Sequence, residues 1–422
     1  MASRNWPELR IGDLGDIFTG RTPPTERTSY FGKEFPFITP GDMHQGMYAR
    51  ETQRSLSLEG AELLKRIKLP ANSVCVSCIG WQMGEVVMTH RPSFSNQQIN
   101  TIVPNSKVDA SFLYYSLRTR KQELLSLGSA TGVRTPILNK SAFCDTKVVV
   151  PPLPVQQRIA GILSAYDELI ENSQRRIKIL EAMARALYRE WFVHFRFPGF
   201  EHRPRVASPL GEIPQGWEVK KLGDISSYIN RGITPRYDEE GDSVVINQKC
   251  VRDQRLSLEA ARRQSKAIPS EKQVCFGDVL INSTGVGTLG RVAQVYETLE
   301  DCTVDTHVTI ARAARDTDLD FYGCCLLSLQ ETFERLGIGA TGQTELGRAA
   351  ISDIEVVVPS ANLQRQFGEA ARGMRLAAMT YGKQIQNLRR TRDLLLPRVL
   401  SGQLAVDAIS GAISDSPAGA PQ

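Results

Sequence analysis

Apolar residues recur with helical spacing along one long segment that ends at Trp191. Steps of four and three residues alternate, which is the a/d pattern of a coiled-coil seam. The members are Ile159, Leu163, Tyr166, Ile170, Ser173, Ile177, Leu180, Ala184, Leu187 and Trp191. Adding 208 gives a second row: Phe367, Ala371, Met374, Ala378, Tyr381, Ile385, Leu388, Arg392, Leu395 and Val399. The rows predict two long helices, each a rod of roughly 60 Å for about forty residues.

The two seams also predict how these helices pack. A long apolar seam is not stable in water, and the natural partner of each helix is the other. The chain order is globule, helix, globule, helix, so the second helix can cover the whole first helix only by running back along it. We therefore expect an antiparallel pair with a pseudo-twofold axis across its middle. The alternative is that each helix packs only on its own globule.

Short matches in a constant order indicate two copies of one unit. The matched segments are LGDI at 14–17 and 222–225, LSLE at 56–59 and 256–259, ATG at 130–132 and 340–342, and VVVP at 148–151 and 356–359. Each copy begins with short β-branched runs, such as Gly277–Asn282, separated by Gly, Pro and Asn. This punctuation predicts an irregular, strand-rich globule with a few helices, one of them at Phe112–Leu127.

Together these patterns predict an α+β fold. It has two tandem strand-rich α/β domains, separated by two long helices that form an antiparallel coiled coil, with a pseudo-twofold internal repeat. The expected parts are a first domain at 1–150, a central helical spacer at 151–197, a proline-rich linker at 198–214, a second domain at 215–358, a C-terminal helical spacer at 359–404 and a disordered tail at 405–422.

Composition and charge narrow the class of protein without deciding its partner. With 422 residues, 41% of them hydrophobic, the chain should form two or three globular domains. Its formal charge of +5 and pI of about 8.7 permit nucleic-acid binding, but strongly basic binding domains exceed a pI of about 9. The sequence has no run of about 18 apolar residues and no secretory signal at its start, so we expect a cytoplasmic protein without a membrane span.

The sequence offers no catalytic or metal-binding constellation. Gly285–Gly290 spells GxGxxG, but the following Arg291–Tyr296 is typical of a strand, so a glycine turn between strands is favoured over a dinucleotide site. Cys75 and Cys78 have ligand spacing but lack a second pair, which favours core thiols over zinc. Walker A, HExxH, GxSxG and the Asn-Pro-Pro-Tyr type of methyltransferase motif are missing. A binding or scaffolding subunit is the better interpretation.

Two similar globules held apart by a spacer suit a two-part target, such as two half-sites on a DNA duplex. Polar loop residues that could contact base edges occur in both copies. The candidates are Arg21, Thr22, Thr39, Asp42, Gln82, Gln97 and Gln98 in the first copy, and Arg231, Asn247, Lys249, Ser283, Thr284 and His307 in the second. For any single residue, a solvated loop position or a turn former is favoured over a base contact.

Four motifs carry a family resemblance. They are VVVPPLPVQQRI at 148–159, VVVPSANLQRQ at 356–366, GEIPQGW at 211–217 and LLLPRVLSGQL at 394–404. Through them the chain resembles the specificity subunit of Type I restriction-modification systems over nearly its whole length. The sequence departs from the pattern at Ser360-Ala361-Asn362, where the first copy has Pro152 and the residues after it.

The resemblance implies a non-catalytic subunit with two target recognition domains that recognise a split DNA sequence with a fixed gap. It implies as partners double-stranded DNA, two modification subunits that use S-adenosylmethionine to methylate adenine N6, and restriction subunits that use ATP and magnesium. The helices would dock the modification subunits and set the gap, and this chain would need no cofactor. Two alternatives remain: a lone methyltransferase or nuclease with an unrecognised site, and a tandem adaptor for proteins.

Overall fold

The computed structural model describes residues 6–404 except 45, 130–134 and 338–344. Its contacts divide the chain into unit 1, Met1–Gln174 with Lys383–Gln422, and unit 2, Arg175–Gly382. Each unit therefore contains part of both long helices, whereas the sequence-based division kept the helices apart from the domains. The repeated ATG segments and the tail expected from 405 lie outside the described residues.

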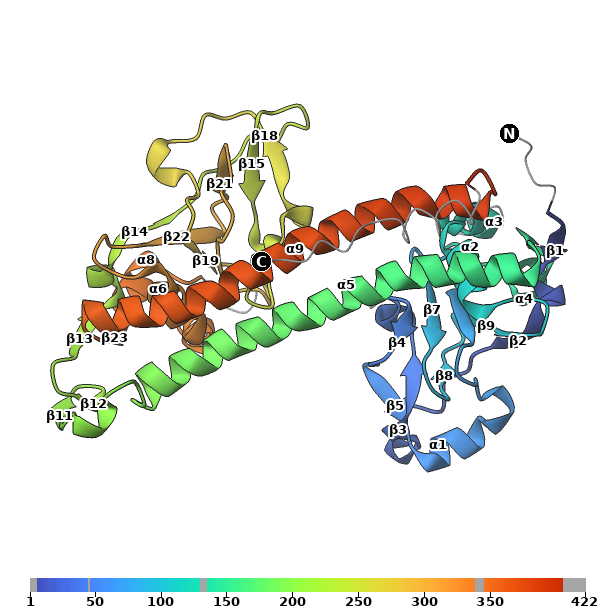
Figure 1. The fold of residues 1–422 in the computed structure, drawn as a ribbon, viewed down its shortest axis with the longest axis horizontal. Helices are drawn as coiled ribbons and strands as arrows, with labels where there is room; N and C mark the ends of the chain where they lie inside the picture. Colours follow the sequence, from blue (N-terminus) through green and yellow to red (C-terminus); the bar gives the residue numbers. More distant parts are fainter. Residues whose placement is uncertain (1–5, 45, 130–134, 338–344, 405–422) are drawn as a thin grey trace, which may run out of the picture. The chain divides into compact units, whose positions relative to one another are not determined.

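Unit 1 is built on two sheets (Figure 1). The larger has the order β2 (Gly15–Thr19), β9 (Ile99–Pro104), β6 (Val74–Ser77), β7 (Val86–Thr89) and β4 (Tyr48–Ala49), and the smaller has the order β5 (Arg54–Leu56), β3 (Phe31–Ile38) and β8 (Phe94–Ser95). A separate pair joins β1 (Glu8–Arg10) to β10 (Lys147–Val149). The short helices are α1 (Leu58–Leu63), α2 (Ala110–Arg118), α3 (Lys121–Ser129) and α4 (Lys140–Asp145). Strands β6 and β7, buried along their length, form the core together with α2.

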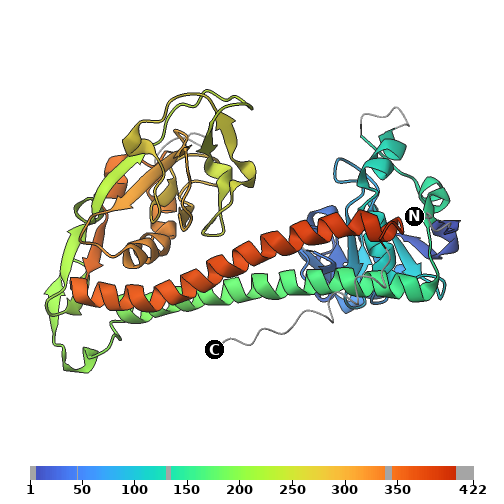
Figure 2. The same cartoon turned by 45° about the horizontal axis from the view of Figure 1, so that its top comes forward.

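Unit 2 has the same plan (Figure 1; Figure 2 gives a view turned by 45°). Its larger sheet has the order β14 (Ser226–Arg231), β22 (Val308–Ala313), β19 (Val279–Asn282) and β20 (Val292–Gln294), and its smaller sheet has the order β18 (Arg262–Gln264), β15 (Ser243–Ile246) and β21 (Cys302–Val304). The two-stranded pairs are β13 (Glu218–Lys221) with β23 (Glu355–Val358), β16 (Val251–Arg252) with β17 (Arg255–Leu256), and β11 (Arg205–Ser208) with β12 (Gly211–Pro214). The short helices are α6 (Leu319–Ser328), α7 (Gln330–Arg335) and α8 (Arg348–Ser352).

The units share their strand pairing. In unit 1, β3 is antiparallel to β5 and parallel to β8, and in unit 2, β15 pairs in the same way with β18 and β21. The edge strand β2 is antiparallel to β9, and the edge strand β14 is antiparallel to β22. In both units, the strand that leads into the globular domain pairs with the strand that leads out of it. These pairs are β1 with β10 and β13 with β23. This common topology confirms the internal repeat.

One glutamine at the start of each long helix ties that helix to its globular domain. Gln156 donates from Nε2 to the carbonyl of Pro151 at 2.8 Å, and its Oε1 accepts from the backbone N–H of Asp109 at 2.8 Å. Gln364 repeats both bonds, with the N–H of Asp318 at 3.1 Å. Asp109 and Asp318 in turn cap the first turns of α2 and α6. The repeated VVVP–Gln motif therefore fixes the start of each long helix to its globular domain.

The long helices are α5 (Leu153–Tyr188), continued by a π-helical turn at Arg189–Val193, and α9 (Ala361–Leu400). Inside unit 1, Ile159 and Leu163 near the start of α5 share a core with Leu396 and Val399 near the end of α9. The early part of one helix is thus packed with the late part of the other.

Inside unit 2 the opposite ends meet. Arg176 Nη1 donates to the Tyr381 hydroxyl at 2.9 Å, and Tyr188 packs on Phe367 with ring centroids 6.0 Å apart. The helices are therefore antiparallel in each unit, as predicted, and the alternative of helices packed only on their own globules is wrong. Every residue of the two predicted seams is buried or half-buried.

One local prediction was wrong. The helix expected at Phe112–Leu127 is broken, because α2 ends at Arg118 and α3 begins at Lys121, with the Thr119 hydroxyl bonded back to the carbonyl of Ser116. The linker expected at 198–214 contains the hairpin of β11 and β12. Its prolines did not prevent strand formation, because Pro214 lies at the end of β12, where a missing N–H is tolerated.

The glycine motif and the cysteine pair have the structural roles expected of them. Gly285, Gly287 and Gly290 have φ values of 110°, 70° and 80° in the turn that leads from β19 to β20, and residues other than glycine rarely adopt these values. Cys75 and Cys78 lie in the core, where burial raises the pKa of their thiols to about 12 and about 11.

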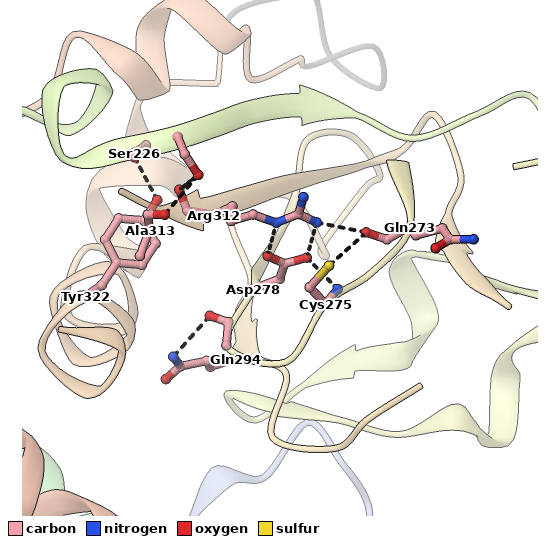
Figure 3. A network of polar contacts seen from close by, with 10 residues as sticks. Ser226, Gln273, Cys275, Asp278, Gln294, Arg312, Ala313 and Tyr322 are labelled. Atoms are coloured by element: carbon pink, nitrogen blue, oxygen red, sulfur yellow. Dashed lines mark hydrogen bonds and ion pairs between the residues drawn. The ribbon is translucent and has the colours of Figure 1, made fainter. Parts of the chain in front are cut away.

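An ion pair between a half-buried arginine and a buried aspartate holds one end of strand β19 (Figure 3). Arg312 donates from Nε and Nη2 to the carboxylate of Asp278 at 2.7 and 2.8 Å, and from Nη2 to the carbonyl of Gln273 at 2.8 Å. The Asp278 carboxylate also accepts from the N–H of Cys275 at 2.7 Å. Because Asp278 directly precedes β19 and Ser283 directly follows it, the pair anchors the strand that presents the candidate loop.

Candidate nucleic-acid interface

The candidate residues of both units follow the ends of equivalent strands. Thr39 comes directly after β3, and Asn247 comes directly after β15. Each starts a short helical turn, in which its carbonyl accepts a hydrogen bond at 2.9 Å from the N–H three positions later. The backbone therefore makes the same turn at the same place in both units, although the side chains of Thr39 and Asn247 differ.

A second equivalent pair lies beside them. The N–H of Asn96 donates to the carbonyl of Ile38 at the end of β3, and the N–H of Asp305 donates to the carbonyl of Ile246 at the end of β15. Two residues later, the N–H of Gln98 donates to Asn96 Oδ1 at 3.2 Å, and the N–H of His307 donates to Asp305 Oδ1 at 2.9 Å. Gln98 and His307 therefore occupy the same structural position, although no sequence match connects them. Burial raises the pKa of the Asp305 carboxyl.

A third pair is set by close backbone contact. Gly20 donates to the carbonyl of Ile99, and Gly232 donates to the carbonyl of Val308. A Cβ atom at Gly20 would collide with the carbonyl oxygen of Asn96, and one at Gly232 would collide with that of Val304. Glycine is thus required at both positions, and it brings the edge strand against the loop that carries Gln98 or His307.

The turns after β6 and β19 form the fourth equivalent pair. Each is held by an antiparallel bridge to a later segment, Ile79 with Ile137 and Thr284 with Glu345. At the corresponding places just beyond these bridges, Trp81 is 76% exposed and Val286 is 81% exposed. Both units thus present an apolar side chain from the same turn.

Candidate residues of unit 1 make hydrogen bonds at two separate places. The Thr22 hydroxyl donates to Gln97 Oε1 at 2.7 Å, and Gln82 contacts His44 at 3.1 Å. Arg21, Gln82 and Gln97 have exposed side chains there. In unit 2, the hydroxyl of Thr284 lies 2.6 Å from His307 Nδ1, and Lys249 and His307 are exposed.

Three of the predicted DNA contacts are used inside the protein. Asp42 is 1% exposed, and its carboxylate accepts from both the N–H and the hydroxyl of Thr39 and from the N–H of Gln53. Asn247 is buried and accepts from the N–H of Lys249 at 2.9 Å. Ser283 is fully buried, with its hydroxyl 2.5 Å from that of Thr309. We assign these three residues to shaping the loops rather than to contacting bases.

Arg231 lies beside these loops, in a surface pocket of about 370 Å³. Its Nη2 donates to the carbonyl of Leu346 at 3.1 Å and pairs with Glu345 at 2.8 Å. The pocket is also lined by Lys272 and Arg348, which were not among the candidates. No sequence pattern distinguishes Lys272 or Arg348 from other basic residues. Only the fold brings their side chains to the same pocket.

Comparison with known proteins identifies the family. A family model for the Type I restriction modification DNA specificity domain matches residues 3–182 and 214–370. The chain belongs to this family. The Type I restriction enzyme MjaIX specificity subunit of Methanocaldococcus jannaschii is 26% identical over 423 residues, which cover 96% of this chain and 95% of that protein. The HindI specificity subunit of Haemophilus influenzae is 34% identical over 184 residues, or 42% of this chain and 39% of that protein.

The fold of this specificity-domain chain is shared with a solved relative. The crystal structure of the Type I restriction-modification system S subunit from M. genitalium superposes with a TM-score of 0.58 at 18% sequence identity, covering 94% of this chain and 96% of that one. Within the described ranges, none of the helices is both apolar and long enough to pass through a bilayer.

Proposed function

We propose that this specificity subunit recognises a two-part DNA sequence, with unit 1 contacting one part and unit 2 the other. The observation that carries the proposal is the repetition of the candidate loops at equivalent strand ends, Thr39 with Asn247 and Gln98 with His307, while the side chains differ. The two units share one backbone arrangement but carry different side chains in their loops. This is what two modules that recognise different base sequences require.

The long helices would connect the two modules and fix the gap between the two DNA parts. We further propose that they dock two modification subunits, which bind S-adenosylmethionine and methylate adenine N6, and that restriction subunits using ATP and magnesium complete the complex. Target adenines would be flipped into the pockets of the modification subunits, since a base inside a duplex cannot be reached. We further propose that the complex acts in the cytoplasm.

Reconstitution tests this proposal. The full-length chain with its modification subunits and S-adenosylmethionine should methylate genomic DNA at one bipartite motif, and each preparation alone should not methylate that motif. Methyl transfer by the chain alone would instead support an undetected catalytic site. A complex that methylates without sequence preference would contradict the recognition role.

A further inference from the structure

The surface pocket of unit 2 combines three cations from separate segments of the chain. Arg231 ends strand β14, Lys272 ends the 3-10 helical turn Ser270–Lys272 before β19, and Arg348 is the first residue of helix α8. Glu345 is the carboxylate among the lining residues, which leaves the lining with an excess of two positive charges. Such an excess in a surface depression attracts an anion.

Local hydrogen bonds hold the three cations at the pocket. Lys272 Nζ donates to the carbonyl of Gly232 at 2.8 Å, and Arg348 Nη1 donates to Asn230 Oδ1 at 2.8 Å. Arg231 is held by Leu346 and Glu345, as described above. A guanidinium has five N–H donors, so Arg348 can keep its bond to Asn230 and still donate to an anion.

The pocket is continuous with the candidate recognition loop. Glu345 bridges to Thr284, whose hydroxyl lies against His307, and the N–H of Leu346 donates to the carbonyl of Ser283 at 2.8 Å. An anion in the pocket would thus be adjacent to the residues proposed to contact bases. In duplex DNA, the anion beside a base is its backbone phosphate.

Unit 1 lacks this charge at the equivalent positions. By strand pairing and bridge position, Thr19 corresponds to Arg231, Ile67 to Lys272, Ile137 to Glu345 and Lys140 to Arg348. One cation therefore stands where unit 2 has three. The contrast shows that the common fold does not itself require the charges.

We propose that this pocket binds a phosphate of the DNA backbone, so that unit 2 makes a sequence-independent contact that unit 1 lacks. The inference rests on the proposed DNA-recognition function. A phosphate contact displaces a condensed cation from DNA, so it contributes to the salt dependence of binding with a slope of about 0.9. At 0.15 M salt, this corresponds to about a fivefold gain in affinity.

The test measures binding of the full-length chain, in complex with its modification subunits, to a fluorescein-labelled mixed-sequence 40-base-pair duplex. Fluorescence anisotropy between 50 and 200 mM NaCl gives the slope of log affinity against log salt. The K272Q/R348Q variant should have a slope smaller in magnitude by about 0.9 and an affinity about fivefold lower at 0.15 M. The loss should be equal for duplexes of different sequence. K140Q, the matched change in unit 1, should keep the wild-type slope.

A wild-type slope in a folded K272Q/R348Q variant would overturn the inference while leaving the proposed function intact. A loss confined to one duplex sequence would also overturn it, because the pocket would then contact a base. Absence of salt-dependent duplex binding by the wild-type complex would overturn the proposed function as well. Thermal unfolding followed by circular dichroism checks folding, and the single R348Q variant, changed at an exposed side chain, carries the test if the double variant fails to fold.

Discussion

Arg392 and Asp167 form an ion pair inside the helix seam of unit 1, with side chains 8% and 13% exposed. The second oxygen of Asp167 accepts from the Tyr115 hydroxyl at 2.6 Å, and burial raises the pKa of Tyr115, so this hydroxyl stays a donor. Arg392 is the polar interruption in the second apolar row, and the pair explains its position. A buried polar pair at one seam position can fix the register of two helices.

The pair predicts a large effect of removing one partner. R392A leaves the Asp167 carboxylate buried without its cation and should lower the free energy of unfolding of unit 1 by about 3–5 kcal/mol. The double variant D167L/R392M removes both charges and should recover most of that loss. Urea unfolding followed by circular dichroism measures both variants. An R392A protein as stable as the wild type would show that the pair is not part of the packed seam.

Asp305 predicts a dependence of stability on pH. Burial raises the pKa of its carboxyl in the folded protein, so its protonated form favours folding. This contribution is complete below the pKa of the unfolded chain and is lost as the pH rises through the folded-state pKa. D305N, which copies Asn96 of unit 1, should therefore be more stable than the wild type at pH 8, with a difference that shrinks toward pH 4. Thermal unfolding across this range measures it, and equal midpoints at pH 8 would contradict the prediction.

Trp81 predicts a spectroscopic signal of DNA binding. Its exposed ring lies in a turn next to Gln82, so contact with a base should quench its fluorescence and add about 1–2 kcal/mol to binding. W81A should weaken duplex binding by this amount and lose the quenching, while W81F should keep most of the affinity. Titration of the complex with duplex DNA measures both effects. Unchanged affinity in W81A would show that this turn does not reach the DNA.

The proposed spacer predicts a movable gap. A seven-residue insertion after Gln174 in α5 and another after Gly382 in α9 preserve the heptad seam and add roughly 10 Å of helix. At about 3.4 Å per base pair, the two DNA parts should separate by about three base pairs. Mapping of N6-methyladenine in cells that carry the variant complex reports the gap. The same gap in variant and wild type would exclude the helices as its determinant.

The sequence predicted the elements that have a regular spacing of apolar residues, above all the two long helices. The hairpin of β11 and β12 was missed, because prolines at strand ends resemble a linker in composition. Within the site, Gln98 and His307 could be proposed as polar loop residues, but their equivalence depends on the hydrogen bonds that the side chains of Asn96 and Asp305 accept from their N–H groups. Different side chains that make the same hydrogen bond leave no common pattern in the sequence.

Changing one unit at a time tests whether the two units recognise separate halves of the DNA target. The Q97A/Q98A variant alters exposed and half-buried amides of unit 1, and the K249A/H307A variant alters two exposed candidate residues of unit 2. Each variant chain is assembled with its modification subunits, and N6-methyladenine is mapped across a genome. Each variant should relax one half of a bipartite motif and leave the other half and the gap unchanged. Changes in both halves from a single variant, or an unchanged motif in both variants, would contradict it.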